Sequence, residues 1–187
     1  IGTPQDDVLI GTECNDLIEG LAGNDVIEGR GGRDIIIAGD GDDVVYSGAG
    51  NDTIDAGAGH DIVFGGSGHD IIRGGAGNDQ LHGEEGNDAI YGEAGDDWLT
   101  GGAGDDRLDG GEGNDSIDGG SGRNTILTGS GNNSVTGGDD GNVVIGGAGI
   151  DTVRLGAGDD VVRAGGGDDV VEAGGGDDAV FGEAGDD

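Results

Sequence analysis

The chain has 187 residues, of which 50 are Gly, and its 41 acidic residues against 7 basic ones give a formal net charge of -34. Aromatic residues make up only 3% and Met is absent, so little large apolar material is present for a conventional globular core. The acidic excess excludes a nucleic-acid-binding protein, which needs clustered Lys and Arg, and no apolar run approaches the roughly 20 residues of a membrane-spanning helix.

High Gly content and high charge are typical of disordered chains, but the order of the residues indicates a repeat instead. A period of nine runs from Gly2 to Asp187 without insertion or deletion. Its pattern is Gly-Gly-x-Gly-x-Asp-x-aliphatic-x, clearest in 74–82 and 110–118, and we number its positions one to nine.

Two positions of the repeat are nearly invariant along the chain. Position six is Asp in 18 of 21 places, namely Asp7, Asp16, Asp25, Asp34, Asp43, Asp52, Asp61, Asp70, Asp79, Asp88, Asp97, Asp106, Asp115, Asp151, Asp160, Asp169, Asp178 and Asp187. Position eight is Leu, Ile or Val in all 20 places, from Leu9 to Val180.

Each repeat predicts a short strand and a turn. Positions seven to nine suit a strand whose middle residue faces inward, and the Gly-rich hexapeptide before them suits a turn. Such strands bury nothing alone, so we expect units to stack as two facing parallel sheets with 18 residues per coil. Asp79 would then lie beside Asp61 and Asp97, and stacked carboxylates need a hard cation such as Ca²⁺.

The first repeats, within 1–19, depart from the pattern. Thr3 and Thr12 stand where the loop usually has Gly, which predicts an end cap. Cys14 cannot form an internal disulfide and is expected to be an inert thiol. Both ends of the chain look like cuts in a longer array, and no signal peptide is recognised at its start.

The next repeats carry outward-facing apolar residues. Position seven on alternate coils is Val8, Val26, Val44 and Ile62, an exposed aliphatic column. The column favours either simple sheet packing or a contact with another domain or another roll. His60, His69 and His82 are too dispersed for one metal cluster and are expected to be solvated.

Residues 122–150 form a degenerate stretch. Asn124, Asn133 and Asn142 replace three consecutive Asp residues, and Ile150 occupies a normally polar turn position. Asn loses the charge, so metal sites here should be weaker, empty or filled by water. The interpretations are repeat decay with an intact roll, or a hinge or partner site.

The motif resembles the RTX, or hemolysin-type, calcium-binding repeats of secreted bacterial toxins, proteases, lipases and adhesins, and the resemblance covers the whole chain. It implies an all-β, right-handed parallel β-roll spanning 1–187, exported unfolded by type I secretion. For one site it implies the carbonyls of Gly75 and Gly77 with Asp79, and those of Gly92 and Ala94 with Asp97. The corresponding carbonyls of earlier turns are those of Gly57, Gly59, Gly66 and Gly68.

The stacked turns give 19 pairs of position-six residues, of which 14 contain two Asp. Fourteen to nineteen Ca²⁺ ions would nearly neutralise the charge of -34. Without metal we expect disorder, because the core is thin and the carboxylates repel each other. Metal binding would then be coupled to folding.

The expected function is therefore a calcium-binding structural module of a secreted or cell-surface protein. No HExxH, GxSxG or Ser-His-Asp arrangement is present, so we expect no enzyme. The alternatives are a filament or adhesin-stalk module and passive calcium buffering. Ice binding is not favoured, because it requires an outward row of Thr and Asn that position three does not supply.

Overall fold

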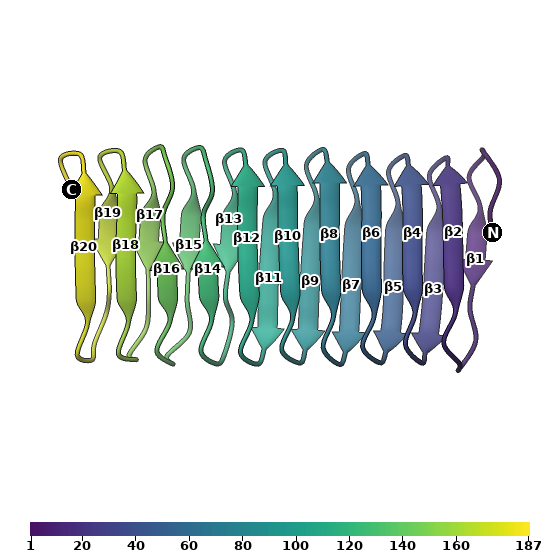
Figure 1. Ribbon diagram of the computed structural model, residues 1–187, viewed down its shortest axis with the longest axis horizontal. Helices are drawn as coiled ribbons and strands as arrows, with labels where there is room; N and C mark the ends of the chain where they lie inside the picture. The colour runs from purple at the N-terminus through teal and green to yellow at the C-terminus, as the bar shows by residue number, and fades with distance from the viewer.

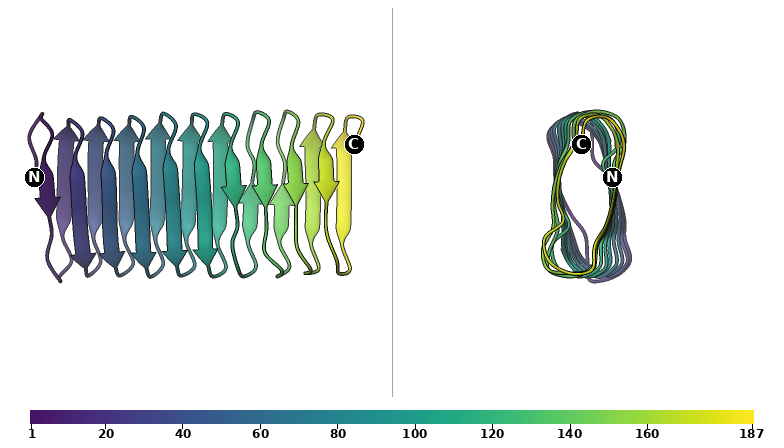
Figure 2. Two further views of the ribbon diagram at one scale, coloured as in Figure 1. Left: turned by 180° about the vertical axis from the view of Figure 1, so that it is seen from behind. Right: turned by 90° about the vertical axis from the view of Figure 1, so that its left-hand side faces the viewer.

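The structure, a computed structural model, describes residues 1–187 and consists of 20 β-strands without a helix. The chain winds as a β-solenoid in which successive strands alternate between two facing sheets (Figure 1). Seen end-on, the roll has a flattened oval outline with turns at its two narrow edges (Figure 2). No helical segment with the length and apolar character of a membrane span is present.

Each sheet contains ten parallel strands. The first sheet consists of β1 (Val8–Ile10), β3 (Val26–Gly31), β5 (Val44–Ala49), β7 (Ile62–Ser67), β9 (Gln80–Glu85), β11 (Trp98–Ala103), β13 (Ser116–Asp118), β15 (Ser134–Thr136), β17 (Thr152–Arg154) and β19 (Val170–Glu172). The second sheet consists of β2 (Leu17–Ala22), β4 (Ile35–Asp40), β6 (Thr53–Ala58), β8 (Ile71–Ala76), β10 (Ala89–Ala94), β12 (Arg107–Glu112), β14 (Thr125–Leu127), β16 (Val143–Ile145), β18 (Val161–Gly166) and β20 (Ala179–Ala184).

The register confirms the predicted 18-residue coil. Ile54 of β6 pairs with Ile72 of β8, and Ile72 pairs with Ile90 of β10. Position eight therefore stacks on position eight along both sheets, so that the two aliphatic ladders face each other inside the roll.

These ladders form the core. Position-eight residues from Ile27 to Val162 are at most 1% exposed. Burial fails only at the ends, where Leu9 and Val171 are half-buried and Val180 is 46% exposed. The position-six carboxylates from Asp25 to Asp115 are also buried, which is unusual for charged groups and requires an explanation.

The strands are longer than the sequence predicts. Thirteen of the 20 strands have six residues, because the parallel ladder continues through positions one to three of the next repeat. Position two adopts a positive φ, as at Gly57 (φ 110°), yet Gly57 still pairs with Gly75. The prediction of a six-residue turn was therefore wrong, and the true turn comprises positions four to six. Strands β13 to β17 have only three residues each, and most of them lie in the degenerate stretch.

Candidate metal sites

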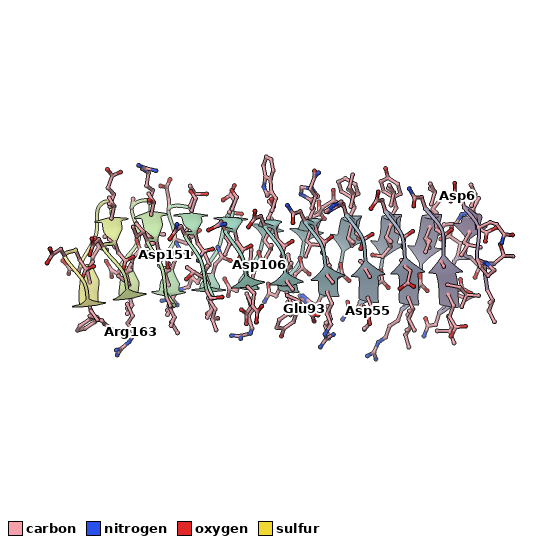
Figure 3. The ribbon with its side chains drawn as sticks, turned by 90° about the horizontal axis from the view of Figure 1, so that it is seen from above. Asp6, Asp55, Glu93, Asp106, Asp151 and Arg163 are labelled. Carbon is pink, nitrogen blue, oxygen red and sulfur yellow. The ribbon has the colours of Figure 1, made fainter.

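Stacking brings the turn aspartates together as the sequence predicts. The backbone N–H of Asp61 donates to Oδ1 of Asp79 (2.9 Å), and the N–H of Asp79 donates to Oδ1 of Asp97 (2.8 Å). The same bond joins successive turns along both edges of the roll. Each carboxylate is thus fixed against the turn one coil earlier, and Figure 3 shows Asp106 lying between the two rows of strands.

The second carboxylate oxygen has no partner in most turns. Thirteen Oδ2 atoms are buried without a hydrogen bond, those of Asp25, Asp34, Asp43, Asp52, Asp61, Asp70, Asp79, Asp88, Asp97, Asp106, Asp115, Asp160 and Asp169. A buried charged oxygen without a donor is costly, because it has lost its water and gained nothing in return. A regular series of such atoms is what a bound cation would satisfy.

Backbone carbonyls supply further oxygens in the same intervals. The carbonyl oxygens of Gly57 and Gly59 face the next coil, since a Cβ built on Gly75 or Gly77 would collide with them. From the other side, Oδ2 of Asp79 and the carbonyl oxygen of Gly92 both face Gly74, where an added Cβ would collide with the carboxylate and lie 2.9 Å from the carbonyl.

The expected carbonyls therefore line the intervals between coils. At position four, the carbonyl oxygens of Gly68 and Gly77 face the coil that follows. Gly66 and Gly75 stand at position two, like Gly57, and have similar positive φ angles. The carbonyl of Ala94 already accepts a hydrogen bond from the N–H of Gly77 (2.8 Å), so one of its two lone pairs is in use. The donor set is oxygen only, which fits calcium rather than zinc.

Burial changes the acidity of the turn carboxylates. Burial raises the pKa of Asp61, Asp70 and Asp97 to about 7, although each carboxylate also accepts a backbone hydrogen bond that lowers it. The same cause raises the pKa of Asp43 and Asp106 to about 6. Without a cation, burial therefore brings protonation of these carboxylates from the usual acidic range up toward neutral pH.

The structure contains no cluster of three or more His, Cys, Asp or Glu side chains that could hold an ion. Any metal site in this roll must combine carboxylates with backbone carbonyls. His60 and His69 lie in turns, His82 lies on β9 with burial lowering its pKa, and Cys14 is an exposed free thiol.

Several predicted ligands differ from the regular pattern. Oδ2 of Asp7 accepts hydrogen bonds from the N–H (2.6 Å) and hydroxyl (2.9 Å) of Thr3, and Thr12 makes the same pair of bonds with Asp16. Asp178 and Asp187 are exposed at the open end of the roll.

The sequence reasoning missed a second ladder, at position five. The N–H of most residues there donates to the position-five side chain one coil earlier, as from Asp96 to Oδ1 of Asn78 (3.1 Å) and from Asn78 to Nδ1 of His60 (2.8 Å). The predominance of Asn, Asp and His at this position was the available signal, because all three offer an acceptor at similar reach. The ladder is interrupted at Arg33, Arg123, Gly141 and Ile150, because none of these residues has a side-chain acceptor.

The aliphatic column is present on the outer face of the first sheet. Val8 pairs with Val26, and Val44 pairs with Ile62. Val8 and Val26 are exposed, but the prediction of an exposed column was wrong for Val44 and Ile62, which are half-buried. The ring of Tyr46 beside the column stacks in parallel on that of Phe64 at 5.1 Å. The column borders a groove of about 620 Å³ at the N-terminal end of this sheet.

A profile of the RTX calcium-binding nonapeptide repeat, in units of 4 copies, matches residues 1–36, 28–63, 37–72, 64–99, 82–117, 91–126, 118–153 and 154–187. A search of curated proteins found no match. The matched segments together cover the chain from end to end. The nine-residue length of the family repeat is also the spacing between successive turns in the structure. The chain therefore belongs to the family of RTX calcium-binding nonapeptide repeats.

Proposed function

We propose that this roll is a structural module of a secreted bacterial protein that folds when calcium binds between its coils, after export as an unfolded chain. The observation that carries the proposal is the series of thirteen buried Oδ2 atoms without a hydrogen-bond partner. Each proposed ion is held by position-six carboxylates and by the carbonyls of positions one to four in two stacked turns. The role is mechanical rather than catalytic.

Coupling between binding and folding follows from the charge and the core. The chain has a formal net charge of -34, and its core contains little beyond one aliphatic residue per repeat. Closing the metal-free roll would bury carboxylates 18 residues apart against each other, opposed by both desolvation and repulsion. Calcium removes both penalties, so its binding free energy becomes folding free energy.

An extracellular location agrees with this mechanism. Calcium modules outside cells bind in the range of about 10⁻⁴ to 10⁻³ M. Such a chain stays unfolded at cytosolic calcium levels and folds after export. We also propose that 1–187 is a single roll, with residues 1–19 as a cap whose Thr3 and Thr12 satisfy Asp7 and Asp16 without metal.

Calcium titration followed by circular dichroism tests the proposal. In chelator the chain should lack β-structure, and calcium should restore it whereas equimolar magnesium should not. Asp79→Asn should raise the calcium midpoint, whereas the matched control Asp55→Asn should not, because Asp55 points outward from β6 (Figure 3). A chain that is fully folded in chelator would refute coupled folding.

A second candidate function is lateral assembly into a filament or adhesin stalk. The observation that favours it is the aliphatic column of Val8, Val26, Val44 and Ile62, flanked by the stacked rings of Tyr46 and Phe64. Light scattering of the calcium-loaded chain should then show a species larger than a monomer, which Val26→Thr should weaken. A loaded chain that stays monomeric at all concentrations would exclude it.

A further inference from the structure

The three Asn residues of the degenerate stretch use their side-chain amides differently from the aspartates they replace. Oδ1 of Asn124 accepts the N–H of Asp106 (2.9 Å), and Oδ1 of Asn133 accepts the N–H of Asp115 (2.8 Å), as the aspartates do. This bond fixes which way the amide points, so Nδ2 takes the place of the unpartnered Oδ2.

In that place each amide closes its own turn. Nδ2 of Asn124 donates to the carbonyl of Gly122 (3.2 Å), and Nδ2 of Asn133 donates to the carbonyl of Gly131 (3.2 Å). Nδ2 of Asn142 donates to the carbonyl of Asp140 (2.6 Å). All three acceptors are position-four carbonyls, the same atoms that would bind calcium in regular turns. A direct N–H···O bond therefore stands where the other turns need a metal ion.

Asp151 completes this run although it is an aspartate. Its Oδ2 accepts a hydrogen bond from the buried hydroxyl of Thr128 (2.8 Å), and that hydroxyl accepts the N–H of Gly147 (3.0 Å). Thr128 stands at position one, where most repeats have Gly or Ala. Asp151 is accordingly absent from the buried aspartates with an unpartnered oxygen, whereas Asp160 and Asp169 are among them.

We propose that residues 122–151 are a calcium-free divider, four consecutive turns closed by side-chain donors instead of metal. The proposal rests on the calcium-binding function of the other turns. An amide N–H directed at the carbonyl repels a cation, and the neutral side chain supplies no charge. The divider separates a long calcium block from Asp25 to Asp115 from a short one that begins at Asp160.

The divider changes the number of ions that the chain takes up. Stacked pairs in which both aspartates have an unpartnered Oδ2 number nine in the long block, from Asp25/Asp43 to Asp97/Asp115. The open end adds at most the two pairs that begin at Asp160 and Asp169. Two-Asp pairing alone predicts 14 ions; the cap threonines remove the pairs Asp7/Asp25 and Asp16/Asp34, and the divider removes Asp151/Asp169, so saturation falls at nine to eleven ions.

Equilibrium dialysis with radioactive calcium at saturation tests the divider. The variant Asn124→Asp/Thr128→Gly/Asn133→Asp/Asn142→Asp should bind more calcium than the wild type, by up to six ions: one for each of the five pairs that gain a carboxylate, and one for Asp151/Asp169, where loss of Thr128 frees Oδ2 of Asp151. The matched control Asn78→Asp/Asn87→Asp/Asn114→Asp adds the same charge at exposed position-five sites and should bind the wild-type number. An unchanged count in the first variant, or 14 or more ions in the wild type, would overturn the divider.

A measurement on the wild type removes any dependence on variant folding. In the calcium-loaded chain, NMR should show the side-chain NH₂ groups of Asn124, Asn133 and Asn142 exchanging with water at least about tenfold more slowly than that of exposed Asn78. Exchange at equal rates would overturn the proposal. Absence of calcium binding in all three proteins would instead defeat the proposed function, so the two failures are distinguishable.

Discussion

The two oxygens of each buried turn aspartate have different tasks. Oδ1 of Asp88 accepts the N–H of Asp70 (2.8 Å), a bond that an Asn side chain can also accept, whereas Oδ2 has no protein partner. Replacing this aspartate by Asn thus removes the charge and keeps the backbone bond. In the degenerate stretch, Asn already stands at position six in three turns, and the backbone bond is kept there.

This separation predicts that one substitution has opposite effects in two conditions. Asp70→Asn/Asp88→Asn/Asp106→Asn should increase β-structure in chelator, because three buried charges are removed from the metal-free roll. With calcium it should lower stability, because metal ligands are lost. Circular dichroism in both buffers checks the sign, and a variant that loses structure in chelator as well would contradict this division of tasks.

Acidification should fold the chain without metal. The folded-state pKa of Asp61, Asp70 and Asp97 is about 7, above the ordinary value of 3.8, so the folded chain binds protons more tightly than the unfolded chain between about pH 4 and 7. The stability of the metal-free roll is therefore greatest at the acidic side of this window and is lost as the pH rises through it.

The measurement is circular dichroism in chelator from pH 7.5 to pH 5, above the isoelectric point of about 4.1. β-structure should increase as the pH falls, and calcium should bind more weakly because protons compete for the same oxygens. A chain equally unstructured at both pH values would show that protonation alone does not relieve the buried charge.

The position-five ladder should contribute modestly to the stability of the loaded roll. Asn78→Ala removes the acceptor for the N–H of Asp96, which water can replace because the bond is exposed. We expect a loss of about 0.5–1 kcal/mol in urea unfolding. The control Arg123→Ala lies at the same position but accepts no bond, so its free energy of unfolding should stay within about 0.5 kcal/mol of the wild type.

At the scale of the strand and turn, the nine-residue period predicts most of the architecture. An aliphatic residue at position eight and Asp at position six each have one role in every coil, so the period gives the 18-residue register, the two sheets and the stacked carboxylates. The strand ends could not be predicted. A Gly with positive φ at position two normally indicates a turn, but here it still pairs with the same position in the neighbouring coil, as Gly57 does with Gly75. The role of Thr128 was also hidden, since its partner Asp151 lies 23 residues away.

The aliphatic ladder predicts where a core substitution matters. Ile90 on β10 is fully buried, so Ile90→Ala should cost about 2–5 kcal/mol in the loaded roll. Val180 on the terminal strand β20 is 46% exposed, and Val180→Ala should cost less than about 1 kcal/mol. Denaturant unfolding with calcium measures the loss of unfolding free energy in each variant. Equal losses would mean that the ends of the roll unfold first and that the measurement does not report on its centre.

At the scale of the whole molecule, contacts are confined to neighbouring coils, and nothing joins the two ends of the roll. Stability therefore accumulates coil by coil, and each interval between turns adds its own share. In the loaded roll, a divider whose turns are closed by side-chain donors limits how far the loss of calcium from one block destabilises the other. With calcium bound as proposed, the roll would consist of two stacks whose turns are joined by metal and, between them, a segment whose turns are joined by side-chain hydrogen bonds.

The dimensions of the chain should report this transition directly. An unfolded chain of 187 residues has a radius of gyration of about 46 Å, and the charge of -34 expands it further. Ten strands per sheet at ~4.8 Å spacing give a roll about 50 Å long, with a radius of gyration of about 17 Å. Small-angle scattering at pH 7.5 should therefore show more than a twofold contraction when calcium replaces chelator, and magnesium at equal ionic strength serves as the control. Contraction by magnesium to the same size would assign the effect to screening of charge, because a hydrated ion that keeps its waters cannot join carboxylates and carbonyls between coils.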